Sequence, residues 1–336
     1  VPSSVLYNAK SFRPVITLNG ENLWKSGDGS ASNPYEIQDL PETLSERLLS
    51  DKSTRPGERT DFSTVLTTDN TKTLYTGTED GTTVYYFAGN ATDNWVKFGG
   101  YYWRIIRTNA DGSTRMLYHG TSTTATDAYI GTSTFNSTYN DPMYVGYIYG
   151  TSNSTAIDRS NTNNSTIKEV IDVWYKNNLN TNYGKYISTT AAYCNDRNVI
   201  DGTYNTSSFS YAGRTRVYSN KAPTYNCLTT EDKFTITGNI GNGKLTYPIA
   251  LMTADEISYA GGVYDKNSLT WYYYNSVKSS STGSINWWLI SPFNWYGNTA
   301  YTFLVYGSNH SGVLGNSYVN NTLGVRPVIS LKADVV

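Results

Sequence analysis

The chain contains 336 residues, of which 38% are hydrophobic and 16% charged, and its formal net charge is −1. This length permits one large domain or two ordinary ones. The sequence has no basic block that would bind nucleic-acid phosphates, and no apolar run of about 18 residues that would span a membrane. It has 31 tyrosines and 8 tryptophans, which can build a core. Few charges among many Tyr, Thr, Ser, Asn and Gly residues are typical of secreted, β-rich surface proteins.

The first 37 residues contain a segment that is nearly repeated at the other end of the chain. Residues 13–18 read RPVITL and residues 326–331 read RPVISL, almost a full chain length later. This spacing predicts that residues 1–37 are the tail of a preceding module in a tandem array, or an N-terminal extension. One module with two similar edge strands is the alternative. Since residue 1 is valine and no signal peptide follows it, we expect a mature or trimmed form, with residues 38–336 as the main domain.

The first half of this domain predicts one short helix and then strands and turns. Leucines at helical spacing predict an amphipathic helix over residues 40–50. From residue 60 onward, β-branched and aromatic runs separated by Gly, Asn and Asp predict antiparallel hairpins. We expect strands at residues 83–87, 95–98, 101–107 and 113–118, with turns at Gly99-Gly100 and at residues 109–112. Residues 119–165 and 194–243 are rich in Thr, Ser, Asn and Tyr, and we expect long loops there.

A first core helix is predicted over residues 166–178. Its apolar residues fall on one face, and Thr166 with Glu169 forms a capping box at its start. We expect this helix to pack on a small antiparallel sheet that includes residues 325–331. Its Trp174 side chain should be buried against that sheet.

A second core helix is predicted over residues 253–260. A capping box of Thr253 and Glu256 starts it, and Gly261-Gly262 ends it. We expect Ile257 to be buried against the same sheet, and residues 245–252 to form a strand before the helix. Taken together, the elements predict an α+β fold with short antiparallel strands, two core helices and long loops.

The two cysteines are Cys194 and Cys227. Neither has a neighbouring histidine, so the pair does not predict a metal site. In an exported protein they would form one disulfide, which closes a loop of about 34 residues and stabilises the fold by roughly 3–4 kcal/mol. In a reducing compartment the alternative is two free buried thiols.

The stretch over residues 284–332 differs in composition from the rest of the domain. Apolar runs at residues 287–290 and 325–331 enclose a segment dominated by Asn, Tyr, Ser, Gly and Thr. This is the residue mixture of a paratope, in which Tyr supplies rigid contact area and Ser, Gly and Asn supply adaptable hydrogen bonds. Phe303 and Val305 alternate with Thr302, Leu304 and Tyr306, which predicts a strand with one face inward and one toward solvent. A polar loop region of an ordinary β-rich domain is the alternative.

Three sequence blocks, in this order, carry a resemblance to a known family. They read NWVKFGGYYWRIIR at residues 94–107, YPIALMTADEISYAGG at 247–262, and WWLISP with GVRPVISL at 287–292 and 324–331. Over residues 38–332 the chain resembles bacterial surface modules of the C-type lectin fold, in the branch similar to the formylglycine-generating enzyme. The resemblance implies a C-type lectin fold in which the terminal strands meet. It also implies that the segment before the last strand forms an exposed ligand-binding face.

The same branch includes the variable proteins of diversity-generating retroelements, in which mutation at template adenines scatters Asn-type codons into Tyr, Ser, Thr, Asp, His and Gly. Residues 293–323 resemble such a variable region, because constant-looking Phe303, Val305, Gly312 and Val319 are interleaved with residues of this kind. A non-diversified adhesion module of the same family is the alternative. The composition contrast between this segment and the apolar runs on either side predicts one contiguous, solvent-exposed set of ligand-binding residues: Asn294, Trp295, Tyr296, Asn298, Tyr301, Leu304, Tyr306, Asn309, His310, Asn316, Tyr318 and Asn320.

Catalytic motifs are not recognisable in the sequence. The enzymatic branch of the family places cysteines in its C-terminal part, and no cysteine follows Cys227. The Glu-Pro-Asn and Gln-Pro-Asp triplets of calcium-dependent lectins are absent, as are phosphate-binding loops, so we predict no cofactor and no metal site. A Ser-His-Asp triad would need His119 or His310, and we expect His310 to be a contact or solvated residue instead.

Three charged residues near the second helix and the last strand have structural explanations. Asp255 and Glu256 fit the N-terminus of a helix, where acids are favourable without any chemistry. Arg326 lies between apolar strand positions, and we expect it to be a paired structural ion with Asp255 or Glu256.

These observations predict a non-enzymatic protein of the extracellular space or of a cell or virion surface. Its partner would be a protein or glycan ligand on another cell or virus, and not a nucleic acid. A carbohydrate-binding adhesin whose aromatic rings stack on sugars is the second hypothesis. An enzyme of the formylglycine-generating type is the third.

Overall fold

The computed structural model describes residues 15, 24–34, 36–37, 43–124, 128–237, 244–267, 286–307 and 312–335. The chain divides into a small unit, residues 1–42, and a main unit, residues 43–335. In the small unit β1 (Trp24–Ser26) pairs with β2 (Glu36–Ile37) in an antiparallel hairpin. Apart from Val15, the predicted repeat segment of residues 13–18 lies outside the described residues.

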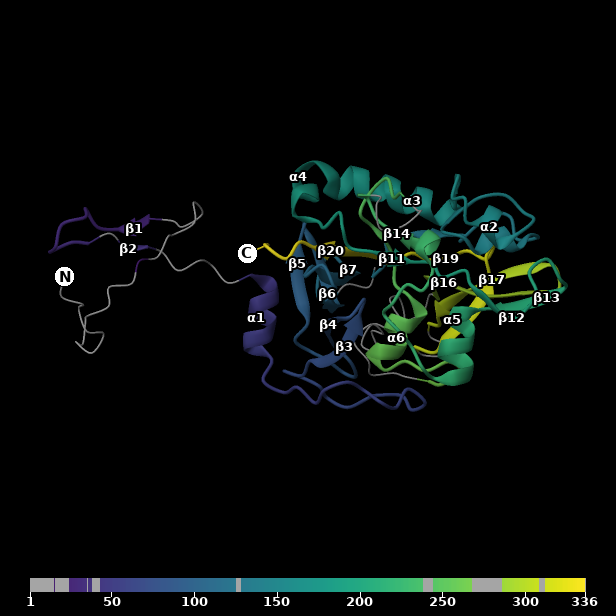
Figure 1. The fold of residues 1–336 in the computed structure, drawn as a ribbon, viewed down its shortest axis with the longest axis horizontal. Helices are drawn as coiled ribbons and strands as arrows, with labels where there is room; N and C mark the ends of the chain where they lie inside the picture. The colour runs from purple at the N-terminus through teal and green to yellow at the C-terminus, as the bar shows by residue number, and fades with distance from the viewer. Residues whose placement is uncertain are drawn as a thin grey trace, which may run out of the picture. The chain divides into compact units, whose positions relative to one another are not determined.

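The main unit is α+β, as predicted, and most of its strands belong to two mainly antiparallel sheets (Figure 1). The first sheet has the strand order β15-β20-β7-β6-β4-β3, with β5 paired to β6. Its strands are β3 (Tyr75–Glu79), β4 (Thr82–Tyr86), β5 (Trp95–Phe98), β6 (Tyr101–Thr108), β7 (Thr114–Gly120), β15 (Ala250–Leu251) and β20 (Pro327–Leu331).

The predicted hairpin around Gly99-Gly100 is confirmed. Phe98 of β5 pairs with Tyr101 of β6, so the two glycines form a two-residue turn. Their φ angles are +64° and +84°, in the left-handed region that glycine enters without a steric penalty. By contrast, β15 is only two residues long, much shorter than the predicted strand over residues 245–252, and Pro248 within that range has no N–H to donate to a ladder.

The second sheet has the strand order β12-β13-β16-β17-β18, with β19 paired to β16 and β8 paired to β19. Its pairs are antiparallel except for β16 with β19. It abuts the first sheet where the Ile290 amide donates to the Met252 carbonyl at 3.0 Å. Its strands are β8 (Thr132–Ser133), β12 (Val199–Gly202), β13 (Ser208–Tyr211), β16 (Trp287–Tyr296), β17 (Thr299–Val305), β18 (Leu314–Tyr318) and β19 (Leu323–Gly324).

The predicted loop regions contain short elements. Two further two-stranded ladders pair β9 (Ile148–Tyr149) with β10 (Asn163–Asn164), and β11 (Tyr193–Cys194) with β14 (Lys233–Phe234). The helical elements are α1 (Leu44–Asp51), η1 (Pro142–Val145), α2 (Thr155–Asp158), α3 (Thr166–Tyr175), η2 (Lys176–Asn180), α4 (Thr181–Tyr183), η3 (Gly184–Tyr186), α5 (Ala212–Arg214), η4 (Thr215–Asn220), η5 (Thr230–Asp232) and α6 (Ala254–Ala260).

Helix α3 packs on the first sheet, although its start differs from the prediction. Ser165, not Thr166, is the N-cap, and its hydroxyl accepts a hydrogen bond from the Lys168 amide. Trp174 is half-buried rather than fully buried. Its ring lies against Tyr118 of β7 at 5.4 Å, so it covers the sheet while keeping one edge in solvent.

Helix α6 confirms its predicted capping box. The Thr253 hydroxyl accepts from the Glu256 amide at 3.0 Å, and the Glu256 carboxylate accepts from the Thr253 amide at the same distance. Gly261 ends the helix with a φ of +112°. Ile257 is fully buried, as predicted. In Figure 1, α3 lies above the strands β11 and β16, and α6 lies below them.

The ends of the main unit meet at the start of α1. The Leu44 amide donates to the Val335 carbonyl at 3.0 Å, so the segment after β20 runs beside the first helix. β20 itself is buried along its whole length between β15 and β7. One continuous hydrophobic core includes Trp103 of the first sheet and Trp288 of the second.

Helix α2 ends at a carboxyl group whose burial gives a testable pH dependence. Burial raises the pKa of Asp158 from 3.8 to about 7, against the opposing charge of Arg197. The folded state therefore binds a proton more tightly than the unfolded state, and stability is lost as the pH rises from about 4 to about 7.

Asp158→Asn should accordingly raise the melting temperature above pH 7 and change it little at pH 4. Asn is neutral and nearly isosteric, and the Arg197 contact to the Asp158 backbone carbonyl is retained. Thermal melts of both proteins across this pH range measure the difference. Asp201→Asn, at an exposed site, is the matched control, and its melting temperature should differ from that of wild type by the same amount at every pH. If the melting temperatures of Asp158→Asn and wild type also differ by a constant amount across this pH range, the prediction is wrong.

Candidate functional site

One row of paired residues crosses five strands of the second sheet. It runs through Asp201 of β12, Ser210 of β13, Asn294 of β16, Tyr301 of β17 and Tyr318 of β18. Directly paired residues point their side chains to the same face of a sheet. The five side chains therefore share one face although they come from distant parts of the sequence.

A second row on this face lies two residues away along the strands. Ser208 pairs with Tyr296, and Tyr296 pairs with Thr299. Asn316, two residues before Tyr318, points the same way on β18. We call the surface formed by these residues the tyrosine face: Asp201, Ser208, Ser210, Asn294, Tyr296, Thr299, Tyr301, Asn316 and Tyr318.

The aromatic rings of the tyrosine face are partly open to solvent. Tyr296 is 62% exposed and Tyr318 is 45% exposed. Tyr301 is half-buried, and its ring centre lies 4.7 Å from that of Tyr318. The row between the two outward rows, Phe209, Trp295 and Ala300, points the other way and is buried. The buried side chains on the inner face of the sheet thus fix the backbone from which the tyrosines project.

Two residues of the predicted binding set are buried, and their predicted exposure was wrong. Trp295 is 6% exposed because it falls on the inward side of β16, where its indole N–H donates to the Thr206 carbonyl at 3.1 Å. Leu304 is 1% exposed, because β17 is covered on both faces at this point and neighbouring Phe303 and Val305 are buried as well. Period-two alternation could not reveal a strand with two buried faces.

The remaining predicted residues have varied surroundings. Asn298 is exposed at the tip of the β16–β17 turn, and Asn320 is half-buried. Tyr306 is half-buried against Gly315, where an added Cβ would lie 2.1 Å from its ring, and its hydroxyl donates to the Asn316 carbonyl at 3.3 Å. Tyr306 therefore supports the backbone of β18. Asn309 and His310 lie outside the described residues.

The sequence prediction missed the part of this face that comes from residues 198–220. Asp201, Ser208 and Ser210 belong to a segment that was predicted to be loop. Arg214 of α5 joins them, with its Nη1 donating to the Ser210 hydroxyl at 2.6 Å and its guanidinium 4.0 Å from the Asp201 carboxylate. No local pattern in this stretch identifies a strand beside β16, because the pairing is long-range.

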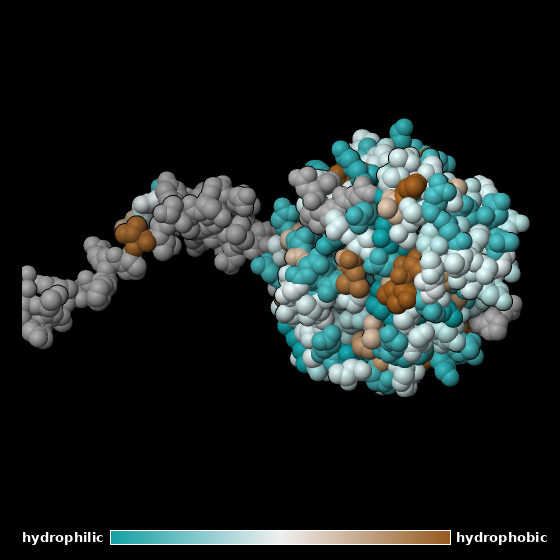
Figure 2. Space-filling view, turned by 45° about the vertical axis from the view of Figure 1, so that its right-hand side comes forward, coloured by the Kyte–Doolittle hydropathy of each residue, from teal (hydrophilic) through white to brown (hydrophobic). Residues whose placement is uncertain are grey.

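Figure 2 turns the molecule so that the end carrying β12, β13 and β17 comes forward. The surface of the main unit is mostly teal and pale, with small separate brown patches. The face seen in this view therefore offers polar groups rather than one large aliphatic patch.

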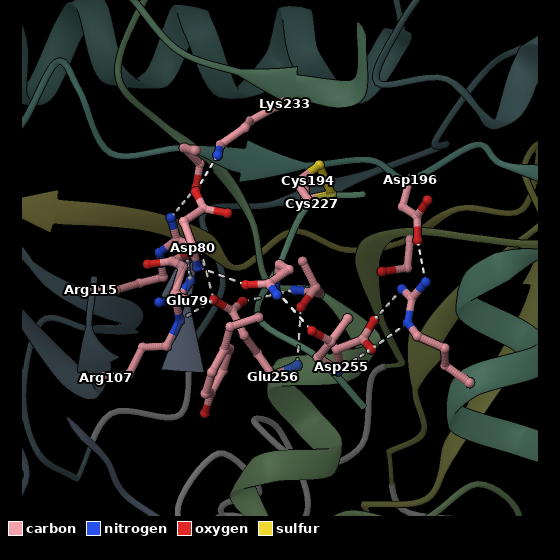
Figure 3. Close-up of a pocket in the computed structure, with 17 residues that line it drawn as sticks. Glu79, Asp80, Arg107, Arg115, Cys194, Asp196, Cys227, Lys233, Asp255 and Glu256 are labelled. Carbon is pink, nitrogen blue, oxygen red and sulfur yellow. Dashed lines mark hydrogen bonds and ion pairs between the residues drawn. A yellow bond between two sulfur atoms is a disulfide. The ribbon is translucent and has the colours of Figure 1, made fainter. Parts of the chain in front are cut away.

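A cluster of charged residues lies in the interior between the first sheet and α6 (Figure 3). Arg107 bridges two carboxylates, with 2.8 Å to Glu79 and 3.0 Å to Glu256. Arg115 lies 2.8 Å from the same Glu256 carboxylate. Burial alone would raise the pKa of Glu256, but Arg115 and Arg107 outweigh it and hold the pKa below its ordinary value.

The acids at the start of α6 are thus structural ion partners, in addition to their role in the helix cap. The Asp255 carboxylate accepts hydrogen bonds from two nitrogens of Arg216, at 2.9 and 3.0 Å. Arg216 also forms an ion pair with Asp196 at 2.5 Å. Lys233 pairs with Asp80 at the edge of the cluster. The pocket that these residues line is partly open, and its volume of about 20 Å³ has room for about one water. The cluster is therefore held together by its own ion pairs, as a structural joint.

Arg326 was predicted to pair with Asp255 or Glu256, and this was wrong. Asp255 and Glu256 form ion pairs with other arginines. The Arg326 guanidinium instead donates a hydrogen bond to the Tyr118 carbonyl at 3.1 Å, and it lies 4.7 Å from the Trp287 ring centre. The other histidine candidate, His119, is 2% exposed and packs edge-on against Trp95 at 4.6 Å. A general base must reach its substrate, so this position does not favour catalysis.

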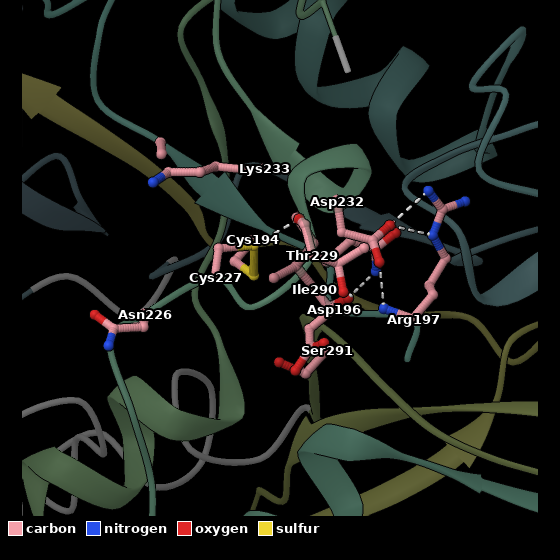
Figure 4. The surroundings of a disulfide bond; sticks show 12 residues. Cys194, Asp196, Arg197, Asn226, Cys227, Thr229, Asp232, Lys233, Ile290 and Ser291 are labelled. Carbon is pink, nitrogen blue, oxygen red and sulfur yellow. Dashed lines mark hydrogen bonds and ion pairs between the residues drawn. A yellow bond between two sulfur atoms is a disulfide. The ribbon is translucent and has the colours of Figure 1, made fainter. Parts of the chain in front are cut away.

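The predicted disulfide is present: Cys194 and Cys227 are bonded at 2.04 Å (Figure 4). Cys194 lies on β11, and Cys227 lies in the loop before η5. That loop covers the charged cluster, because Tyr225 lies 4.4 Å above the Arg107 guanidinium and the Asn226 side chain accepts from the Asp80 amide at 2.7 Å. The disulfide therefore fastens the loop over the buried charges.

Within the part of the chain that the structure describes, no three His, Cys, Asp or Glu residues are grouped so that they could hold a metal ion. No described helix is both long and apolar enough to cross a membrane. Comparison with known proteins gives no match to the chain among protein-family models, curated proteins or solved structures.

Proposed function

We propose that the protein is an extracellular or surface-displayed binding protein, and that its ligand, a protein or a glycan, docks on the tyrosine face. The observation that carries this proposal is the row Asp201, Ser210, Asn294, Tyr301, Tyr318, which brings two distant segments onto one face and is exposed at its two ends, Asp201 and Tyr318. Tyr, Asn and Ser around an arginine are the residue types that protein-binding surfaces favour.

A C-type lectin scaffold is the fold that we propose for the main unit. The sequence blocks at residues 94–107, 247–262 and 324–331 support it. So do the meeting of the first and last elements of the main unit at Leu44 and Val335, and the position of the aromatic segment just before β20. In this proposal residues 1–37 are the end of a preceding similar module, as the repeated RPVI segment suggests.

The direct test replaces three tyrosines of the face together, as Tyr296→Ser, Tyr301→Ser and Tyr318→Ser. Exposed side chains carry little folding energy, usually within about 0.5 kcal/mol each, and the Tyr301–Tyr318 ring contact adds roughly 0.5–1.5 kcal/mol. The melting temperature should therefore fall by only a few degrees. Binding to ligands found by protein or glycan array should be lost.

The matched control is Tyr186→Ser, at an exposed tyrosine outside the tyrosine face. This variant should keep full binding. Equal loss of binding in the control, or unfolding of the triple variant, would contradict the proposal. Whether the ligands come from the protein array or from the glycan array decides between the two ligand classes.

Diversification by a retroelement is part of the proposal and is tested in the encoding DNA. A nearby near-copy of the segment for residues 293–323 should differ only opposite adenines. Substitutions should fall at outward positions such as Asn294, Tyr296 and Tyr318, and should spare Trp295 and Leu304, whose burial couples them to folding. Differences spread evenly over buried and exposed codons would contradict it.

A further inference from the structure

Arg214 is held at the border of the tyrosine face in an unusual way. Its guanidinium carbon lies 5.3 Å from the Phe293 ring centre and 5.4 Å from the Tyr218 ring centre, and Nη1 donates to the Ser210 hydroxyl. Two rings and one hydrogen bond thus fix the orientation of the planar group. Preorganised in this way, an arginine loses little conformational entropy when it binds a further partner.

The charge of Arg214 is only loosely balanced. Its nearest carboxylate, Asp201, is 4.0 Å away, and that side chain is 74% exposed. Arg107, Arg115 and Arg216 in the buried cluster, by contrast, each have a carboxylate oxygen within 3.0 Å. The Nε of Arg214 is buried and has no hydrogen-bond partner among the described residues, so a ligand would meet the outer guanidinium nitrogens of a side chain that is 26% exposed. The guanidinium fork is the group best suited to take a carboxylate in a bidentate manner.

The surroundings of Arg214 add positive charge and contact area. Lys221 also lies over the ring of the exposed Tyr218, 5.5 Å from its centre. Tyr264 packs against the same ring at 4.6 Å and against Phe293 at 5.4 Å, so the aromatic cluster continues from the core to this border. Asn294, which pairs with Ser210, lies beside Arg214 with a buried Oδ1 that has no partner among the described residues, and the exposed ring of Tyr296 follows two residues later on β16.

We propose that Arg214 determines specificity on the tyrosine face by selecting a protein partner that presents an exposed Asp or Glu side chain. The inference rests on the proposed function, since it assigns the partner class of the same face. A paired-strand surface is broad rather than a closed pocket, which suits a protein partner better than a small sugar. Arg214 lies outside the proposed variable region, residues 293–323. Its preference for an acidic partner would therefore stay constant while the residues of that region varied.

On binding, the partner's carboxylate would displace the loose contact between Arg214 and Asp201. The two substitutions should therefore act in opposite directions. Arg214→Met, which keeps length and packing on the two rings, should weaken binding by about ten- to a hundredfold, the range for loss of a charge-assisted contact. Asp201→Asn removes the competing carboxylate and should strengthen binding by about two- to fivefold.

The experiment selects binders from a phage-displayed random peptide library on the full wild-type chain. From these binders we keep only the peptides that no longer bind the variant carrying Tyr296→Ser and Tyr318→Ser. We expect these peptides to be enriched in Asp and Glu and to show the two opposite effects above. Arg47→Met, a charge change at an exposed site on α1, is the matched control and should leave binding unchanged. Melting curves establish that every variant is folded.

The outcomes separate this inference from the proposed function. If retained peptides bind Arg214→Met as tightly as wild type, the face binds but Arg214 does not select, and the inference is wrong. If no peptide depends on Tyr296 and Tyr318, while acidic glycans on an array depend on Arg214, the protein-partner assignment is wrong. If neither probe depends on the tyrosines, both the inference and the proposed function are wrong.

Discussion

Glu256→Ala is expected to lower the free energy of unfolding by about 3–5 kcal/mol, because it leaves buried arginine charges without their shared carboxylate. Glu256 is almost fully buried and contacts both Arg107 and Arg115. The same carboxylate accepts the Thr253 amide at the start of α6, so the substitution also weakens the helix cap. Chemical denaturation of wild type and variant, with the denaturant slope checked for constancy, measures the loss.

Glu231→Ala is the matched control, since Glu231 is exposed on η5 and carries the same charge. It should change the free energy of unfolding by less than about 0.5 kcal/mol. Glu256→Gln should fall between the two, because the amide keeps the shape and one acceptor but removes the charge. A loss below about 1 kcal/mol for Glu256→Ala would mean that water solvates the two arginines, and that the cluster is not the joint described above.

Removing the disulfide is expected to have the second largest effect. Cys194 and Cys227 are 33 residues apart, and a loop of this length gives a stabilisation of about 3–4 kcal/mol on the chain-entropy model. The double variant Cys194→Ala, Cys227→Ala should lose about that much. Because the loop also carries Tyr225 and Asn226, amide exchange should rise first in residues 222–230 and around the charged cluster.

Reductant provides the control for the disulfide prediction. Wild-type protein in a strong reductant should approach the stability of the double variant, and the double variant should not respond to reductant. If the double variant unfolds at the same denaturant concentration as oxidised wild type, the loop is held by its ring and ionic contacts alone. The disulfide would then be dispensable for the fold.

Local sequence signals were reliable where the structure depends on neighbours in the chain. Gly99-Gly100 predicted the β5–β6 turn, since two successive positive φ angles favour glycine at both positions. Thr253 and Glu256 predicted the start of α6, because a capping box needs only residues three positions apart. At α3 the same motif was assigned one residue late, at Thr166 instead of Ser165, since adjacent hydroxyl residues are equally able to cap.

Residues of the candidate site were predicted less completely. Tyr296 and Tyr318 were selected by composition and are exposed, but Trp295 and Leu304 were selected by the same criterion and are buried. Composition describes which side chains a segment offers, whereas the direction of each side chain depends on strand register. Register depends on partner strands, and β13, which lies beside β16, is about eighty residues earlier in the sequence.

The sequence by itself determined the α+β class, the β5–β6 hairpin, the two core helices and the aromatic, polar character of the segment before the last strand. These follow from turn residues, capping residues and periodicity, which are interactions within a few residues. Only the tertiary structure decided which tyrosines face outward, that Glu256 is shared between Arg107 and Arg115, and that Arg214 joins the tyrosine face. Those arrangements depend on strand pairing and burial between segments up to about 150 residues apart, and no local pattern carries that information.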